Sequence, residues 1–363
     1  MAFLYSDGIG IAGIACAVPD NEVTVESFSS VFGKEISEKF TAATGIKAMY
    51  KALPEQTAGD LAFAAAEELF RHIPVERNKI GALLFVTQSP DYRRPATACV
   101  LQHRLGLSMD CAAMDIGLGC SGFVYGLQTA MSMMERSDME YVLLLMGETA
   151  SKLVDPKDRS IVMMYGDAGA AILLERRRGE KCATLMRTDG SRFKTIILPA
   201  GGFRDMNPSH ERFVCNDGIE RSLYDIYMDG TNVFSFSISD VPEAVKDFFD
   251  HTETTAEDYD LFVFHQANQF IIRQIAKKTH IPMDKVPVSL DRYGNSGGIS
   301  IPLTMCDRYG GKPDGVKRTL TAGFGIGLSW GVSAMNIDTE KLFPVVRTDE
   351  WFRDGKITPG MLM

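Results

Sequence analysis

The sequence predicts an α/β fold in which mixed sheets are covered by helices on both faces. Short apolar runs typical of buried strands alternate with segments of helical periodicity through most of the chain. The composition is that of a packed globular protein, because hydrophobic residues make up 45% and charged residues 23%. At the usual ~100–200 residues per domain, the length of 363 residues indicates two domains or one large double-layered domain.

The strands are predicted from continuous apolar runs that end in turn residues. The clearest run, residues 80–87, reads Ile-Gly-Ala-Leu-Leu-Phe-Val-Thr and is followed by Ser-Pro-Asp. Three further strands are predicted over residues 111–116, 141–146 and 261–264. Helices are predicted over residues 59–71 and 123–134, where apolar residues recur at helical spacing.

Two stretches have the composition of surface segments. Residues 191–220 are polar and rich in Gly, Pro, Asn and Asp, and the chain from about residue 339 has mixed charges and two prolines. Both are expected to lie on the outside of the folded protein.

Charge and cysteine usage exclude several classes of protein. Lys and Arg number 38 against 47 Asp and Glu, a net charge of −9, which argues against a nucleic-acid partner. The seven cysteines include no Cys-x-x-Cys pair, so neither a disulfide framework nor a zinc ribbon is predicted. The apolar run 9–18 is far below the ~20 residues that span a bilayer. We therefore expect a cytoplasmic protein with no membrane span.

The segment 114–123, Met-Asp-Ile-Gly-Leu-Gly-Cys-Ser-Gly-Phe, places Cys120 between a predicted strand and a predicted helix. At a helix N-terminus the macrodipole and the free N–H groups stabilise a thiolate, and the flanking glycines leave room for a substrate. We therefore predict that Cys120 is a nucleophile. The alternative is a small buried cysteine, which is what we expect of Cys16, Cys99, Cys111 and Cys306.

The same glycines also match a dinucleotide-binding fingerprint. Gly117-x-Gly119-x-x-Gly122 follows a predicted strand and opens a helix, and Glu148 stands beyond the next strand. A hydride-transfer enzyme, however, has no use for a cysteine inside its pyrophosphate loop. An NAD(P)-dependent oxidoreductase remains an alternative at this point.

Two further polar residues stand where ligands of α/β proteins bind. His265 follows four apolar residues at the carboxyl end of a predicted strand, and Asn295 lies in a Gly-rich segment before a predicted helix. Each alone has a simpler interpretation, a buried core histidine or a turn asparagine. With Cys120 they supply a nucleophile and two hydrogen-bond donors suited to an enolate oxygen. No metal site is predicted, because no second ligand stands at metal-binding spacing near His265.

Over nearly its whole length the sequence resembles the β-ketoacyl-ACP synthase III family of the thiolase-like superfamily. The matching motifs include Tyr165-Gly-Asp-Ala-Gly-Ala, His265-Gln-Ala-Asn and Gly294-Asn-Ser, and they occur in the family's order. The resemblance implies a five-layered αβαβα thiolase-like fold of two similar halves. Residues 1–185 would carry the nucleophilic cysteine and residues 186–363 the histidine and asparagine, and the protein would be a homodimer.

The resemblance also implies a reaction. Cys120 would accept an acyl group from an acyl-CoA or acyl-ACP primer, and malonyl-ACP would lose CO₂ while His265 and Asn295 hold the enolate oxygen. The carbanion would then attack the acyl thioester and release a β-ketoacyl-ACP. The backbone N–H groups of Cys120 and Ile326 would form the oxyanion hole. No cofactor is implied beyond the CoA or ACP thioesters.

Other implied binding residues lie at the expected rim of the site. Arg159 and Asn268 would contact the CoA or pantetheine chain, although Ala43 stands where the family commonly has an arginine. Phe270 likewise replaces an arginine that meets the acidic carrier protein. Acyl carrier protein would instead meet the basic residues Arg273, Lys277 and Lys278. The alternative for these three charges is a solvated helix face.

Two other functions remain open from the sequence. A non-decarboxylating acyltransferase of the same fold would use the same cysteine, and a non-catalytic partner subunit would need none of the three polar residues. The presence of Cys120, His265 and Asn295 together argues against the second. The primer and the pathway, fatty-acid or specialised acyl biosynthesis, are not determined by the sequence.

Overall fold

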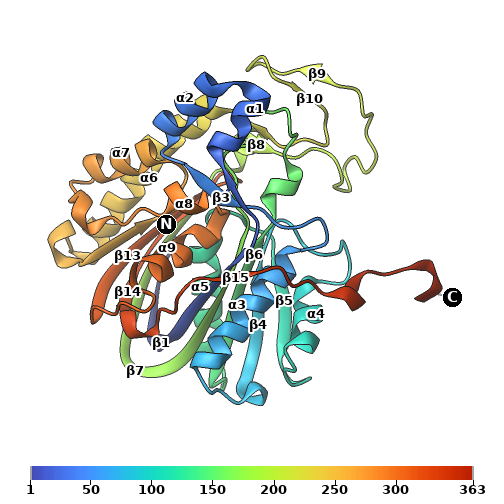
Figure 1. Cartoon of the computed structure of the whole chain (residues 1–363). Coiled ribbons are helices and arrows are strands. Elements are labelled where there is room, and N and C mark those ends of the chain that lie inside the picture. The colour runs from blue at the N-terminus through green and yellow to red at the C-terminus, as the bar shows by residue number, and fades with distance from the viewer. Residues whose placement is uncertain (1, 362–363) are drawn as a thin grey trace.

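A computed structural model describes residues 2–361, and its elements form five layers (Figure 1). The outer helices of one side are α3 (Ala58–His72) and α4 (Thr97–Arg104), and those of the other are α6 (Gly230–Thr252) and α7 (Gln269–Lys278). Between the two sheets lie α5 (Gly122–Glu135) and α9 (Ser300–Tyr309). The αβαβα architecture expected from the resemblance is therefore confirmed.

Nine strands form one hydrogen-bonded network that is divided into two layers. The first layer contains, in order, β5 (Ala112–Ile116), β4 (Ile80–Val86), β6 (Tyr141–Glu148), β7 (Ala168–Thr188) and β1 (Ala2–Pro19). The second contains β12 (Leu261–Phe264), β13 (Val316–Gly325), β14 (Ser329–Asp338) and the far ends of β7 and β1. Every strand and helix predicted from the sequence is present, within a few residues of its expected ends.

The long strands β1 and β7 belong to both layers. Residues 9–17 of β1 pair with the first part of β7, and residues 2–7 pair with its last part, which also pairs with β14. The register shifts between Asp7 and Ile9, where Gly8 has φ +74° and Gly179 on the opposite strand has φ +92°. Glycine adopts these left-handed angles without a Cβ clash. The boundary between the two predicted halves of the chain, after residue 185, falls inside β7.

Short elements complete the fold. Near the N-terminus and the centre these are β2 (Glu22–Thr24), α1 (Ser29–Phe32), α2 (Lys34–Thr44), β3 (Ala48–Tyr50) and α8 (Leu290–Tyr293). Residues 191–220 form mostly exposed loops, as predicted, joined by two-residue strand pairs. These pairs are β8 (Ile196–Ile197) with β11 (Tyr227–Met228) and β9 (Phe213–Val214) with β10 (Glu220–Arg221).

The C-terminal segment is only partly the surface cover that the sequence predicts. Residues of β15 (Val346–Thr348) pair in parallel with the end of β1, so this part of the tail adds a strand to the first layer. Beyond it the chain continues to residue 361, and its last part projects away from the body of the protein (Figure 1).

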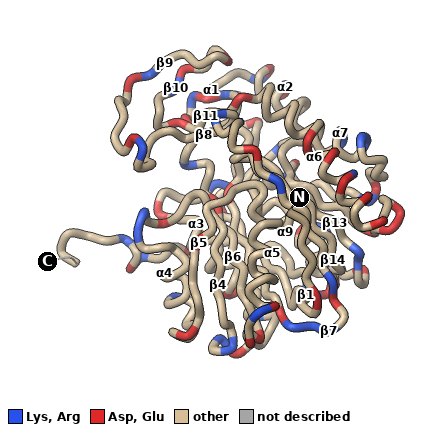
Figure 2. The backbone as a smooth tube through the Cα atoms, turned by 180° about the vertical axis from the view of Figure 1, so that it is seen from behind, with Lys and Arg blue, Asp and Glu red and all other residues tan. Residues whose placement is uncertain are grey.

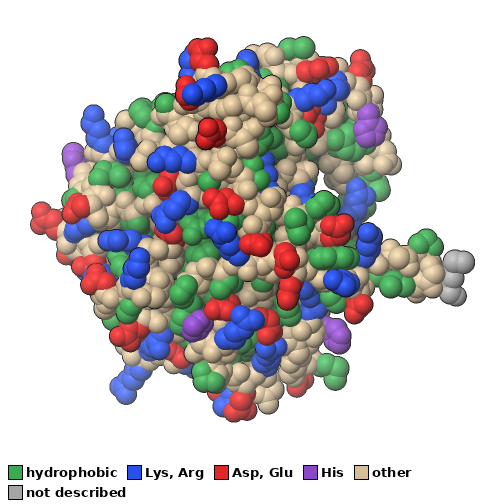
Figure 3. Space-filling view, in the orientation of Figure 1, with side chains coloured by type: hydrophobic (Ala, Val, Ile, Leu, Met, Phe, Trp, Pro, Cys, Tyr) green, Lys and Arg blue, Asp and Glu red, His purple; other side chains and the backbone are tan. Residues whose placement is uncertain are grey.

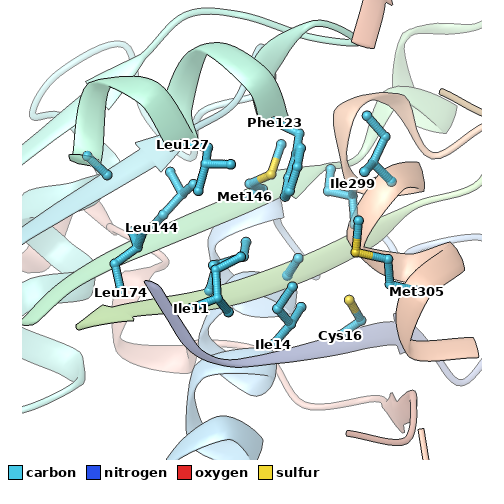
Figure 4. Close-up of a cluster of buried hydrophobic side chains, with 14 of the residues drawn as sticks. Ile11, Ile14, Cys16, Phe123, Leu127, Leu144, Met146, Leu174, Ile299 and Met305 are labelled. Carbon is cyan, nitrogen blue, oxygen red and sulfur yellow. The ribbon is translucent and has the colours of Figure 1, made fainter. Parts of the chain in front are cut away.

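The central helix α5 is buried because apolar side chains surround it on several sides (Figure 4). Phe123 and Leu127 of α5 pack against Leu144 and Met146 of β6, and Ile299 closes the cluster from the loop before α9. Burial of each such side chain contributes about 1.5–3 kcal/mol. This packing fixes the N-terminal end of α5, where Cys120 stands, between the two sheets.

Charged residues lie mainly outside this core. The traces of β4, β6 and α5 are almost free of charge, whereas Lys, Arg, Asp and Glu mark the loops and outer helices (Figure 2). Acidic and basic side chains are interspersed on the face shown in Figure 3. Among residues 2–361, no helix is long and apolar enough to cross a membrane.

Candidate active site

The structure brings the three predicted catalytic residues together at one cavity of about 210 Å³. Cys120 precedes α5, His265 follows β12, and Asn295 lies in the loop between α8 and α9. All three line the cavity together with Ile326 and Asn268. The carboxyl ends of strands from both halves meet here, as is usual for ligand sites of α/β folds.

Cys120 is held by close backbone contacts from the second half. A Cβ atom on Gly325 would lie 2.7 Å from Cys120 Cβ and 3.0 Å from its Sγ, so only glycine fits at position 325. The neighbouring Ser121 hydroxyl is 2.7 Å from that of Ser329, which donates to the Ile326 carbonyl at 2.8 Å. Cys120 and the turn after β13 therefore form one closely packed and hydrogen-bonded unit.

The acidity of Cys120 differs from the sequence prediction. Burial raises the pKa of the thiol to about 12, and the nearby Glu148 carboxylate adds to the rise. The backbone N–H groups of Cys120 and Ile326 act in the opposite direction on this pKa, because both lie close to the sulfur. The expectation that the helix N-terminus holds a thiolate is thus wrong for the free protein, since desolvation outweighs it. Both N–H groups act on the Cys120 sulfur, and their role as an oxyanion hole stays a prediction.

His265 is buried at the end of β12 and stays neutral. Its backbone N–H donates to the Ala322 carbonyl at 2.8 Å, and its ring lies edge-on to Phe324. Burial lowers the pKa of the imidazole to about 4. Its Nδ1 atom is 3.0 Å from the Gly297 carbonyl and 2.9 Å from the Ser300 hydroxyl, so Nε2 is left for the cavity.

Asn295 is oriented by its own loop. Its backbone N–H donates to the Met164 carbonyl at 2.8 Å, and its Oδ1 accepts the Gly297 N–H at 3.0 Å. Since the amide oxygen is occupied, the NH₂ group is free to donate. His265 and Asn295 therefore offer side-chain nitrogens to the same cavity as the Cys120 sulfur.

The cavity also contains residues that the sequence analysis did not place there. Glu148, considered only as part of a dinucleotide fingerprint, is buried and accepts the Gln88 N–H at 2.7 Å and the Ser89 hydroxyl at 2.8 Å. Burial raises its pKa to about 7. Tyr165 lines the same cavity. The position of Glu148 at the carboxyl end of a strand was a usable signal for a site residue.

A thin wall of residues from the 191–232 region separates the catalytic cavity from a wider outer hollow of about 740 Å³. In the β8–β11 pair, Ile196 and Met228 line the catalytic cavity, while Ile197 and Tyr227 line the hollow. Successive strand residues point to opposite faces, so a two-residue strand pair is enough to close the cavity on this side.

The predicted rim residues do not all reach the cavity. Asn268 lines it and caps α7 by accepting the Ile271 N–H at 2.8 Å. Phe234 also lines it, and its ring stacks on exposed Phe270 with centroids 5.7 Å apart. Arg159 is exposed and is not among the lining residues. On the outer side of α7, the basic residues Arg273, Lys277 and Lys278 are exposed.

The geometry does not fit the dinucleotide alternative. A Cβ atom on Gly298 would lie 2.6 Å from the Gly119 carbonyl, and one on Gly323 would lie 3.0 Å from the Cys120 carbonyl. Loops of the second half therefore cover the start of α5, where a pyrophosphate would need open space. No group of three potential metal ligands occurs within residues 2–361. All seven cysteines are free, and Cys99, expected to be buried, is exposed on α4.

Comparison with known proteins agrees with this site. Residues 114–190 match the family model 3-Oxoacyl-[acyl-carrier-protein (ACP)] synthase III, and residues 249–337 match that of its C-terminal part. The chain is 33% identical over 331 residues to a β-ketoacyl-[acyl-carrier-protein] synthase III of Caldanaerobacter subterraneus, covering 90% of this chain and 97% of that protein. It is 31% identical over 338 residues to a putative 3-oxoacyl-[acyl-carrier-protein] synthase 3 of Campylobacter jejuni, covering 91% and 94%.

A solved structure has the same architecture. The 3-oxoacyl-(acyl-carrier protein) synthase of Burkholderia xenovorans LB400 superposes with a TM-score of 0.89 at 34% identity, covering 95% of this chain and 99% of that one. The chain belongs to the β-ketoacyl-ACP synthase III family, acyltransferases of the thiolase fold that condense an acyl primer with malonyl-ACP.

Proposed function

We propose that this chain performs the decarboxylative condensation with Cys120 as the acyl carrier and with His265 and Asn295 as the donors to the enolate oxygen. The observation that carries the proposal is the arrangement of the cavity. One nucleophilic sulfur, two backbone N–H groups and two side-chain nitrogens converge there, although they come from four segments of the chain.

The first step is acyl transfer. The Cys120 sulfur attacks the carbonyl carbon of the primer thioester, and the oxyanion that forms lies between the N–H groups of Cys120 and Ile326. When the tetrahedral intermediate collapses, the bond to the primer sulfur breaks. The Cys120 proton ends on the departing CoA or carrier thiol, so the step needs no cofactor.

The second step makes the carbon–carbon bond. Malonyl-ACP loses CO₂, and the electron pair of the broken bond moves into an enolate whose oxygen accepts hydrogen bonds from His265 and Asn295. The enolate carbon attacks the acyl-Cys120 carbonyl, and the Cys120 sulfur leaves as a thiolate that takes a proton from water. Because His265 is neutral, it donates a hydrogen bond to the enolate rather than a proton, which keeps the carbon nucleophilic.

The rim of the cavity supports thioesters of pantetheine as substrates. Asn268 has an amide NH₂ group free to meet a pantetheine amide, because its oxygen caps α7. We assign Arg159 to the CoA or carrier end of the substrate, and the exposed basic residues of α7 to an acidic acyl carrier protein. No cofactor beyond the thioesters enters the proposal.

We also propose a homodimer formed through the edge of the first sheet. The edge strand β5 pairs only with β4, and its Met114 side chain is 41% exposed. Unpaired apolar edge strands of this kind pair readily with another chain. Sedimentation at micromolar concentration tests this, and a monomer would contradict it. With seven free cysteines, the proposed location is the cytoplasm.

Intact-protein mass spectrometry tests the catalytic proposal. After incubation with a panel of acyl-CoA and acyl-ACP donors, one acyl group should add to the protein and should be absent from Cys120→Ser. Release of ¹⁴CO₂ from labelled malonyl-ACP should accompany β-ketoacyl-ACP formation. An acyl-enzyme that forms without any CO₂ release would instead identify a non-decarboxylating acyltransferase.

A further inference from the structure

The Nδ1 atom of His265 lies within hydrogen-bonding distance of two groups that favour different protonation states of this nitrogen. The Gly297 carbonyl at 3.0 Å can only accept a hydrogen bond, whereas the Ser300 hydroxyl at 2.9 Å can donate or accept. A neutral imidazole carries one proton, either on Nδ1 or on Nε2. The two neighbours therefore decide which nitrogen presents a proton to the cavity.

The other hydrogen bonds of these neighbours resolve the conflict. The Gly297 carbonyl already accepts the backbone N–H of Ser300, so it does not depend on the imidazole for a donor. The Ser300 oxygen already accepts the backbone N–H of Gln266 at 3.1 Å. Among residues 2–361 its own proton has no acceptor within hydrogen-bonding distance other than Nδ1, and Ser300 is 1% exposed. A buried hydroxyl proton without an acceptor costs about 1–3 kcal/mol.

We infer that the Ser300 hydroxyl donates to His265 Nδ1 and thereby fixes the imidazole proton on Nε2, which makes Ser300 a positioning residue for the reaction. The inference deepens the proposed function, since it concerns the donor that meets the enolate. With the proton on Nε2, His265 and Asn295 are both donors at the cavity. With the proton on Nδ1, a lone pair would face the enolate oxygen and repel it.

The neutral state of the ring makes the tautomer matter. A protonated imidazole would donate from both nitrogens and would not need Ser300, but burial keeps the pKa of His265 at about 4. Ser300 begins α9, and Ile299 and Ile301 on either side of it are buried in the central core. Its hydroxyl is therefore held by the helix and not by solvent.

The wild-type protein gives the first test. With ¹⁵N-labelled histidine, the two ring nitrogens have distinct chemical shifts, and the spectrum of His265→Ala assigns the His265 signals among the six histidines. We expect a protonated Nε2 and an unprotonated Nδ1 at pH 7. A protonated Nδ1 would overturn the inference, whether or not the protein is active with malonyl-ACP.

The second test is Ser300→Ala, which removes the donor and leaves the Gly297 carbonyl as a partner for a protonated Nδ1. We expect His265 to shift toward that tautomer and malonyl-ACP decarboxylation to fall about tenfold or more, while acyl-Cys120 forms at its normal rate. The matched control is Thr304→Val, which removes another buried hydroxyl one turn along α9 and should change neither readout. Unchanged decarboxylation in Ser300→Ala with Nε2 still protonated would refute the role.

The outcomes separate this inference from the proposed function. Loss of all CO₂ release in the wild-type protein would remove the proposed condensation, while the tautomer of His265 would still be read from its spectrum. Equal losses of acyl transfer and decarboxylation in Ser300→Ala would indicate a general structural defect and contradict a role through His265.

Discussion

The floor of the cavity and its rim are built in different ways. On the floor, His265 and Asn295 are fixed by backbone hydrogen bonds, and Cys120 is packed so closely against Gly325 that no Cβ fits between them. At the predicted rim, Arg159, Arg273 and Lys277 are exposed side chains on a loop and on an outer helix, and none of them lines the cavity. The floor can hold reacting atoms to within a fraction of an ångström, and the rim can only attract and orient a large substrate. Variants on the floor should therefore change the chemical step, and variants at the rim should change binding.

The largest effect is expected from His265→Ala. Removing one of the two enolate donors should lower malonyl-ACP decarboxylation by about 10²–10³-fold, because the remaining donor cannot hold the developing charge alone. Formation of acyl-Cys120, followed by intact mass, should continue. The matched control is His103→Ala, an exposed histidine on α4. If acyl transfer falls as far as decarboxylation, the assignment of acyl transfer to Cys120 and of enolate binding to His265 is wrong.

Gly325→Ala should lower activity nearly as much as His265→Ala, but it should slow both acyl transfer to Cys120 and the condensation. The new Cβ would lie 2.7 Å from Cys120 Cβ, so the turn after β13 must move away from the nucleophile. A displacement of about 1 Å costs about 10²-fold in rate. The rate of Cys120 acylation measures this loss. Gly202→Ala is the control, because nothing lies within 4 Å of its Cβ position and its φ is not left-handed. Equal activities of the two variants would show that the packing around Cys120 accommodates the added Cβ atom, against our inference.

Glu148→Gln should change how stability depends on pH. Burial raises the pKa of Glu148 from 4.5 to about 7, so the wild-type protein loses stability as pH rises from 4.5 through 7. Between pH 5 and pH 8 this loss amounts to about 2–3 kcal/mol, and the variant should lack it. The lowered pKa of His265 acts in the opposite direction, because its contribution is lost as pH falls from 6.5 toward 4. Urea unfolding of both proteins at several pH values measures the difference, and parallel curves would contradict it.

The smallest effect is expected at the rim. Reversing the charges of Arg273 and Lys277 should raise the KM for malonyl-ACP severalfold at low salt and leave kcat unchanged. The effect should fade at high ionic strength, because exposed charges are screened. Lys181→Glu, an exposed lysine next to the Gly179 bend of β7, is the control. A loss of kcat, or an effect that persists in salt, would mean that α7 contributes to the floor and not only to docking.

The floor could be predicted from the sequence because each of its residues has a local signature. Cys120 lies in a strand–glycine–helix segment, His265 ends a buried strand, and Asn295 lies in a glycine-rich loop. Their meeting at one cavity follows from the fold that the motifs imply together. The acidity of Cys120 could not be predicted in this way, because its burial results from loops almost 200 residues later in the chain.

Other features depend on packing that no local pattern encodes. Arg221 directly follows the polar stretch 191–220 that the sequence assigns to the surface, yet it is 1% exposed and pairs with buried Asp158 at 2.7 Å. Ser300 is one of several serines in its segment, and only the tertiary structure puts its hydroxyl beside an imidazole. The tail was predicted to lie over the surface because of its mixed charges and prolines, but three of its residues pair with β1 as a strand.

The sharing of β1 and β7 between both layers has a consequence for how the chain folds during synthesis. Residues 2–7 are synthesised long before residues 181–186, with which they pair, and they complete a sheet whose other strands extend to residue 338. This segment must therefore wait for much later parts of the chain, and contacts this distant in sequence make folding slow. Until then its apolar strand lies open to other chains and to chaperones. A tag or truncation at the N-terminus should thus affect the C-terminal half first.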